Sequence, residues 1–241
     1  MIFIPRRKII IFTIFIAMLA FLSITIHHQS SGVFSGEITK RIVLDAGHGL
    51  PDGGAIGASG TIESELNLKI AKKVQKLLKK KGYDVIMTRE DENSICEDEK
   101  GISSKKKRDM QKRLEIMNSA EADMFVSIHM NKFTSSVYRG AQVIYSGNFR
   151  ESEELAGIIQ KELHSLPDNK SKREHLKAPS GIFLLKNAQI PAVIVECGFL
   201  SNFDEEKLLG TEKYQDALAK AISKGIENYY ERNEENENIR D

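Results

Sequence analysis

The chain has 241 residues, of which 41% are hydrophobic and 29% are charged. This is an ordinary globular composition with enough apolar residues for a sizeable core. The formal net charge is +1, so the bulk charge gives no reason to expect a nucleic-acid partner. The two cysteines, Cys96 and Cys197, exclude a disulfide framework. We expect Cys197 to be buried, because it directly follows an apolar run.

The N-terminus predicts a segment that directs export. Residues 1–8 form a basic flank, and the eighteen residues 9–26 carry no charge. This order is typical of a membrane-directing segment whose basic end stays in the cytosol. The apolar stretch is long for a cleaved signal and just long enough to span a membrane, so an anchor is favoured over a cleaved signal. Residues 27–39 then form a polar tether, and the rest of the chain is exported.

Helices and strands are predicted to alternate along residues 40–230. Strands are predicted at residues 41–44, 83–88, 124–129, 141–145, 182–185 and 192–196. Helices are predicted at residues 65–81, 105–118, 151–166 and 212–230. The alternation predicts a single three-layer α/β domain with a mostly parallel central sheet and helices on both faces. We expect loops at residues 91–104 and 167–180 and a charged, frayed tail at residues 231–241.

Three of the predicted strands lead into a histidine or a glutamate. His48 follows the apolar run 42–44, His129 ends residues 124–129, and Glu196 ends residues 192–196. Because ligands gather at the carboxyl ends of parallel strands, we expect these side chains to meet at one edge of the sheet. Catalytic zinc takes three nitrogen or oxygen ligands and keeps one position open. The pattern therefore predicts a zinc site with a general base beside it.

The third zinc ligand has to be a carboxylate, and we predict Glu63. It follows the flexible stretch 53–60 and precedes Ser64, which we expect to be the N-cap of the next helix. Asp45 and Asp52 compete with it. Asp45 is better placed to accept the second ring N–H of a ligand histidine. The other histidines are interpreted as solvated: His27, His28, His164 and His175.

Glu196 has a structural and a catalytic interpretation. A carboxylate at the end of an apolar strand is desolvated, and buried acids need partners. A structural glutamate would pair with Arg89 or Arg113, whereas a catalytic one would be a base with a raised pKa. We favour the base. Taken singly, His48, His129 and Glu63 would each be ordinary structural residues, and it is their convergence that predicts a site.

Two other enzyme classes are disfavoured by spacing. The glycine-rich stretch 47–60 lacks the third glycine of a dinucleotide loop and the Lys-Ser/Thr pair of a phosphate loop. Ser127 and His129 lie two residues apart on one predicted strand, without the order of a nucleophile–base–acid triad.

Five motifs occur in order between residues 40 and 230. They are DAGHG from Asp45, PDGGA from Pro51, ESELN from Glu63, SIHMN from Ser127 and ECGFLSN from Glu196. Together they resemble the zinc-dependent N-acetylmuramoyl-L-alanine amidases of the Amidase_3 type. The resemblance covers nearly the whole exported part.

The resemblance implies hydrolysis of the amide between the lactyl group of muramic acid and L-alanine in peptidoglycan. Carried over by position, His48, Glu63 and His129 would bind one zinc ion, and Glu196 would be the catalytic glutamate. The short layout is similar to the germination-specific, spore-cortex members of the family. That likeness implies a role in cortex formation through muramic lactam, and hence in germination. An accessory protein is left open.

Two alternative functions stay open. Another zinc hydrolase of the wall, a carboxypeptidase or endopeptidase, would need an arginine placed for a terminal carboxylate. A non-catalytic wall-binding module would use the metal for structure, and a free base such as Glu196 speaks against it. Arg89 and residues 91–104 are candidate substrate contacts. Ser127 and Asn131 either orient a substrate or make structural hydrogen bonds at strand ends.

Overall fold

The computed structural model describes residues 40–96, 102–166 and 173–238. The predicted flank 1–8, apolar segment 9–26 and tether 27–39 lie outside these residues. Within the described ranges, no helix is both long enough and apolar enough to span a bilayer.

One sheet of six strands forms the centre of the fold, in the order β2-β1-β3-β6-β4-β5. Its strands are β1 (Arg41–Ala46), β2 (Asp84–Met87), β3 (Met124–Asn131), β4 (Gln142–Tyr145), β5 (Leu176–Lys177) and β6 (Ala192–Phe199). The four strands from β2 to β6 run parallel, and only β4 pairs antiparallel, with β6. The long central strands β3 and β6 are buried along nearly their whole length, as near-continuous apolar runs in a parallel sheet require.

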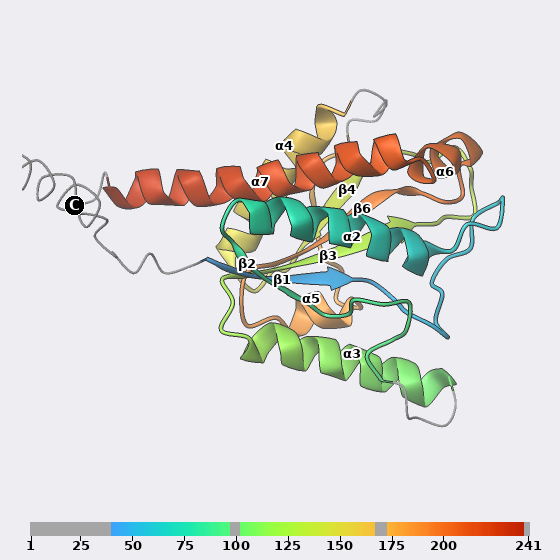
Figure 1. Ribbon diagram of the computed structural model, residues 1–241, viewed down its shortest axis with the longest axis horizontal. Helices are drawn as coiled ribbons and strands as arrows, with labels where there is room; N and C mark the ends of the chain where they lie inside the picture. The colour runs from blue at the N-terminus through green and yellow to red at the C-terminus, as the bar shows by residue number, and fades with distance from the viewer. Residues whose placement is uncertain (1–39, 97–101, 167–172, 239–241) are drawn as a thin grey trace, which may run out of the picture. The chain divides into compact units, whose positions relative to one another are not determined.

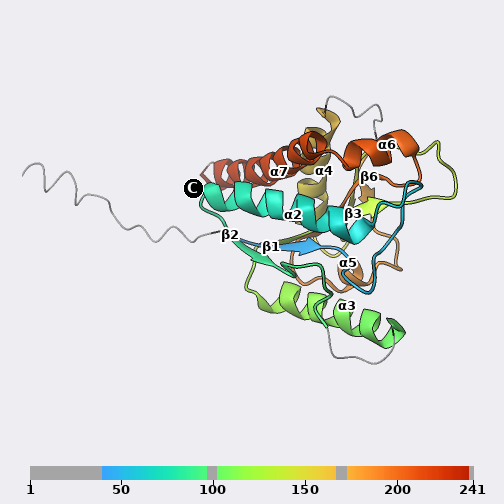
Figure 2. The same ribbon diagram turned by 45° about the vertical axis from the view of Figure 1, so that its right-hand side comes forward.

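Helices cover both faces of this sheet (Figure 1). On one face lie α2 (Glu63–Lys80), α4 (Arg150–His164) and α7 (Glu212–Asn238); on the other lie α3 (Ile102–Ser119) and α5 (Phe183–Asn187). Figure 2 shows the same two helical layers from a second direction, with α6 (Phe203–Leu209) beside the end of β6. The predicted three-layer α/β fold with a mostly parallel sheet is confirmed.

Helix packing follows the apolar periodicity of the sequence. In α2, Leu66, Ile70, Val74 and Leu78 form one buried stripe, and burying each such side chain contributes about 1.5–3 kcal/mol. In α7, Gly225 allows a close approach to α4, because a Cβ there would lie 2.8 Å from the Cα of Ile159. The result is a large core between the sheet and α2, α4 and α7.

Two predicted elements are wrong in type. Residues 182–185 were expected as a strand, but α5 occupies this place and buries Leu184 and Leu185 against the α3 side of the sheet. A short apolar run does not distinguish a strand from a buried helical turn. The loop predicted at residues 167–180 contains the two-residue strand β5.

Two helix boundaries differ from the prediction, and one short helix was not predicted. Ser64 is not an N-cap: Ile62 holds that position, and Glu63 begins α2. Residues 231–238, expected as a frayed tail, continue α7. The short helix α6 was not predicted, although Asn202 caps it by accepting a hydrogen bond from the Glu205 backbone N–H, a recognisable start signal.

Candidate active site

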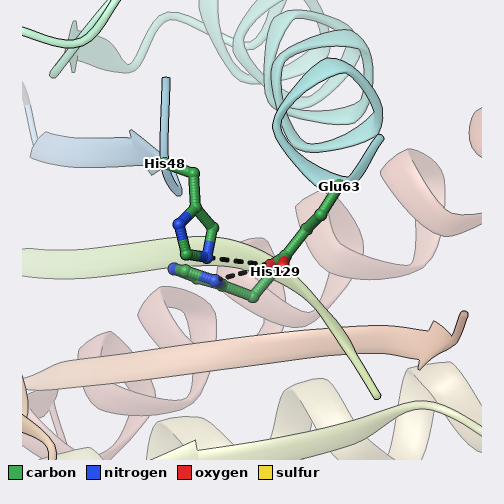
Figure 3. Close-up of side chains that lie close together, drawn as sticks. All are labelled: His48, Glu63 and His129. Carbon is green, nitrogen blue, oxygen red and sulfur yellow. Dashed lines mark hydrogen bonds and ion pairs between the residues drawn. The ribbon is translucent and has the colours of Figure 1, made fainter. Parts of the chain in front are cut away.

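The three predicted ligands meet at the carboxyl edge of the sheet. His48 lies two residues beyond β1, His129 lies in β3, and Glu63 is the first residue of α2 (Figure 3). One ligand atom of each lies within 4.8 Å of the others. The Oε1 atom of Glu63 lies 3.3 Å from Nε2 of His48 and 2.9 Å from Nδ1 of His129. Two strand ends and a helix start therefore present two imidazoles and a carboxylate to one point.

This donor set could hold a metal ion and is of the kind that binds zinc. Tetrahedral bonds of about 2.0–2.2 Å place neighbouring ligand atoms about 3.3–3.5 Å apart. The His48–Glu63 separation of 3.3 Å lies in this range, and the His129–Glu63 separation of 2.9 Å is shorter by a few tenths of an ångström. The side chains of His48 and His129 are 20% and 19% exposed, against 4% for Glu63. The cluster thus opens to solvent on its histidine side, where a substrate could enter.

Glu63 is held in place by several hydrogen bonds. Its Oε2 accepts from the backbone N–H of Ala55 at 2.7 Å, and its Oε1 accepts from the backbone N–H of Met130 at 3.1 Å. Burial raises the pKa of Glu63, but hydrogen bonds from His129 and His48 outweigh it and hold this pKa below its ordinary value. The carboxylate is therefore anionic and fixed, as a metal ligand needs to be.

His48 has an unusual backbone and a carboxylate partner. Its φ is 61°, in the left-handed region that non-glycine residues rarely adopt. Its Nδ1 lies 3.1 Å from Oδ2 of Asp52, which also binds Nζ of Lys106 at 3.1 Å. Burial lowers the pKa of His48, but hydrogen bonds to Asp52 and Glu63 raise it to about 9. The prediction that Asp45 accepts the second ring N–H of a ligand histidine is wrong. Asp52 is the partner of the His48 ring instead.

Removing the Asp52 carboxylate should weaken metal binding. Partners that orient a ligand histidine are typically worth about 10- to 100-fold in metal affinity. We expect Asp52→Ala to weaken zinc binding by about that factor in a competition titration with a chromogenic chelator. Asp84→Ala, at the opposite end of the sheet, is the control and should leave zinc affinity unchanged. Equal affinities in both variants would show that Asp52 does not support the site.

Glycines at two positions let the ligands pack against the backbone. A Cβ on Gly47 would lie 2.2 Å from Nε2 of His129. Gly54 has a φ of +72°, and a Cβ there would lie 2.6 Å from Oε2 of Glu63 and 2.7 Å from Cδ2 of His48. Gly47 of the DAGHG motif and Gly54 of the PDGGA motif thus allow a close approach to these three side chains.

Glu196 is half-buried and lies in the strand next to His129. It stands in register with His129 across the β3–β6 pairing. Its Oε2 is buried and has no hydrogen-bond partner among the described residues. Burial raises the pKa of Glu196 to about 7, against the opposing charge of His129. The structural interpretation, in which Glu196 pairs with Arg89 or Arg113, is wrong. Both arginines bind other carbonyls and carboxylates of the protein.

Asp45 and Arg113 form a buried ion pair beneath the site. Both side chains are fully buried, and Arg113 donates to Asp45, to Oδ2 of Asp109 at 2.7 Å and to the His48 carbonyl. Ser127 and Thr88 donate their hydroxyls to the same Asp45 carboxylate. Burial raises the pKa of Asp45, but Arg113 and the hydroxyls outweigh it and lower this pKa. Ser127 therefore makes a structural hydrogen bond, which was one of its two interpretations.

Breaking this pair should be costly. Removing one partner of a buried ion pair leaves an uncompensated charge, which typically costs about 3–5 kcal/mol. We expect Arg113→Leu to lower the free energy of unfolding by about that amount in urea titrations. Lys112→Leu, an exposed neighbour in α3, should change it by less than about 0.5 kcal/mol. A similarly small change for Arg113→Leu would contradict the role assigned to the pair.

The remaining sequence candidates lie outside the cluster or inside the protein. Arg89 is 6% exposed, so its predicted contact with substrate is wrong. The backbone carbonyl of Asn131 accepts from the Leu200 N–H at 2.8 Å, which is a structural bond. Of the loop 91–104, residues 97–101 lie outside the described residues. His164 is half-buried and bonds the Arg173 carbonyl rather than being solvated.

Both cysteines are free. Cys197 is fully buried, as predicted. Its burial raises the pKa of its thiol above the ordinary value, so it behaves as a small apolar side chain.

Comparison with known proteins shows the family to which the chain belongs. Residues 42–228 match the family model described as N-acetylmuramoyl-L-alanine amidase, Amidase_3. The chain belongs to the Amidase_3 family. The resemblance drawn from the five motifs is thereby confirmed, and the protein is an enzyme of the N-acetylmuramoyl-L-alanine amidase class.

Individual Amidase_3 relatives cover most of the chain. It is 42% identical over 195 residues to the germination-specific N-acetylmuramoyl-L-alanine amidase of Bacillus subtilis, covering 79% of this chain and 80% of the relative. Among solved structures, the CwlD amidase of Clostridioides difficile in complex with the GerS lipoprotein matches with 43% identity and a TM-score of 0.76, covering 80% of this chain and 98% of that one. The catalytic domain of CwlV from Bacillus (Paenibacillus) polymyxa matches with 30% identity and a TM-score of 0.67, covering 80% and 98%.

Proposed function

We propose that this amidase is zinc-dependent and cleaves the bond between the lactyl group of N-acetylmuramic acid and L-alanine in peptidoglycan. The observation that carries the proposal is the convergence of His48, Glu63 and His129 beside Glu196, whose buried Oε2 has no hydrogen-bond partner among the described residues. Two histidines and a carboxylate are a standard catalytic zinc set, and a free base next to them has no use in a purely structural site.

In this proposal the zinc supplies the electrophile: when bound, it lowers the pKa of a water toward about 7 and polarises the amide carbonyl. Glu196 takes the proton from the attacking water as the water oxygen bonds to the lactyl carbonyl carbon. The C–N bond then breaks, and Glu196 returns the proton to the departing alanine nitrogen. The products are a lactyl carboxylate and a free N-terminal alanine.

The pKa of Glu196 suits both halves of this proton transfer. A group with a pKa of about 7 can accept a proton and release it again near neutral pH. His48, Glu63 and His129 hold the reacting groups in place. Asp52 keeps the His48 ring oriented through Nδ1 and leaves Nε2 for the metal.

A carboxypeptidase finds less support in the described residues. It would need an arginine aimed at a terminal carboxylate, but Arg89 and Arg113 are buried and donate to carbonyls and carboxylates of the protein itself. Product analysis of digested sacculi tests the choice. The amidase should release peptides with free N-terminal alanine and leave glycan strands without peptide. New C-terminal residues within the stem peptides would instead identify a peptidase.

We extend the proposal to the biological setting. The 42% identity to a germination-specific amidase supports a role in forming the muramic lactam of spore cortex. Residues 9–26 would then export the enzyme and anchor it at the membrane, and the basic residues 1–8 would stay in the cytosol. A relative of 43% identity was solved with a lipoprotein, which supports an accessory partner as part of the proposal.

A further inference from the structure

Arg89 lies just beyond β2. Its buried guanidinium donates hydrogen bonds to backbone carbonyls. Its Nε donates to the Ala46 carbonyl at 2.8 Å, and its Nη1 donates to the Asp91 carbonyl at 2.7 Å. Its Nη2 donates to both the Gly47 carbonyl at 3.0 Å and the Ser64 carbonyl at 2.8 Å. All four of these acceptors are backbone carbonyls.

These carbonyls belong to the two segments that carry His48 and Glu63. Gly47 precedes His48 in the chain, and Ser64 follows Glu63, so one nitrogen of Arg89 bridges the neighbours of two proposed ligands. Asn67, one turn along α2, makes a second bridge. Its Nδ2 donates to the Gly47 carbonyl at 3.1 Å and to Oε1 of Glu63 at 3.3 Å.

The His48 segment needs such support. His48 has a φ of 61°, and a left-handed non-glycine residue persists only where its surroundings fix it. A guanidinium is suited to this task, because its N–H groups form a rigid planar fork that reaches several acceptors at once. A lysine ammonium is a compact point donor on a flexible stem and cannot span the same set of carbonyls.

We propose that Arg89, assisted by Asn67, is a positioning residue that sets the separation of His48 and Glu63 before the metal binds. The inference rests on the proposed function, because it takes these two residues as zinc ligands. A ligand pair held at its bound separation avoids the ordering cost that a mobile pair incurs on binding. Arg89 touches neither metal nor substrate in this role.

The test compares Arg89→Lys with Leu163→Ala in the full-length, metal-free protein. Leu163 is a fully buried core residue of α4, a helix that carries none of the ligands, so its truncation lowers stability without touching the bridges. Zinc dissociation constants come from competition with a chromogenic chelator, the coordination geometry from the visible absorption of the cobalt(II) form, and stability from thermal unfolding. We expect Arg89→Lys to weaken zinc about 10- to 100-fold and to change the cobalt spectrum. Leu163→Ala should lower Tm and keep both metal readouts.

Wild-type zinc affinity and an unchanged cobalt spectrum in Arg89→Lys would overturn the inference and leave the proposed function standing. If Arg89→Lys does not fold, Asn67→Leu removes the second bridge, and an unchanged zinc affinity there would overturn it equally. The proposed function fails separately if the wild type binds no zinc, or if His129→Ala binds it as tightly as the wild type.

Discussion

Glu196→Gln should abolish turnover while the protein keeps its zinc. The amide has nearly the shape of the carboxylate but cannot take up a proton, so only the base is lost. General-base catalysis contributes about 10²- to 10⁴-fold, and we expect kcat to fall by that range on purified sacculi. Zinc content, measured by atomic absorption, should stay equal to that of the wild type, because Glu196 lies beside the proposed ligands rather than among them.

Glu205→Gln is the matched control for this variant. Glu205 is a buried acid that accepts hydrogen bonds from the Phe199 and Gly140 backbone N–H groups and has no proposed role in proton transfer. Its turnover should stay within a few-fold of the wild type. Hydrolysis retained at wild-type rate by Glu196→Gln would remove Glu196 from the mechanism.

His48→Ala should lose zinc and activity together. Structural zinc sites have apparent binding free energies of about 10–16 kcal/mol shared among their ligands, so removing one ligand costs about 2.5–4 kcal/mol. That corresponds to roughly 10²- to 10³-fold weaker zinc binding. Chelator competition measures the affinity, and release of free N-terminal alanine measures the activity.

His175→Ala is the control for this second variant. His175 packs against the Tyr145 ring at a centroid distance of 5.7 Å, away from the cluster, and its removal should leave both readouts intact. A His48→Ala protein that binds zinc as tightly as the wild type would mean that the metal is held by a different set of residues.

The meeting of His48, Glu63 and His129 could be predicted because their positions follow from topology. His48 and His129 extend from parallel strands, and carboxyl ends of parallel strands share one edge of the sheet. Glu63 could be named because a flexible stretch and a helix start place it near that edge. The family motifs point to the same residues.

The supporting residues could not be predicted from sequence in the same way. Asp52 reaches His48 only because Gly49 and Asp52 pair across a tight turn, a geometry that spacing does not reveal. Charged residues are expected at the surface, so the sequence did not indicate that Arg89 and Arg113 would be buried and bound to the backbone around His48.

One error in the predicted fold has a different cause. Residues 182–185 were assigned to a strand because their short apolar run lacks periodicity.

The most direct test of a zinc-dependent muramoyl-alanine amidase is muropeptide analysis of sacculi treated with the protein in three states. These are the protein as purified, after chelation, and after zinc is restored. We expect mass spectrometry to find stem peptides with free N-terminal alanine in the first and third states and none in the second. Stem peptides released at the same rate after complete chelation, or cleavage at a different bond after zinc is restored, would contradict this function.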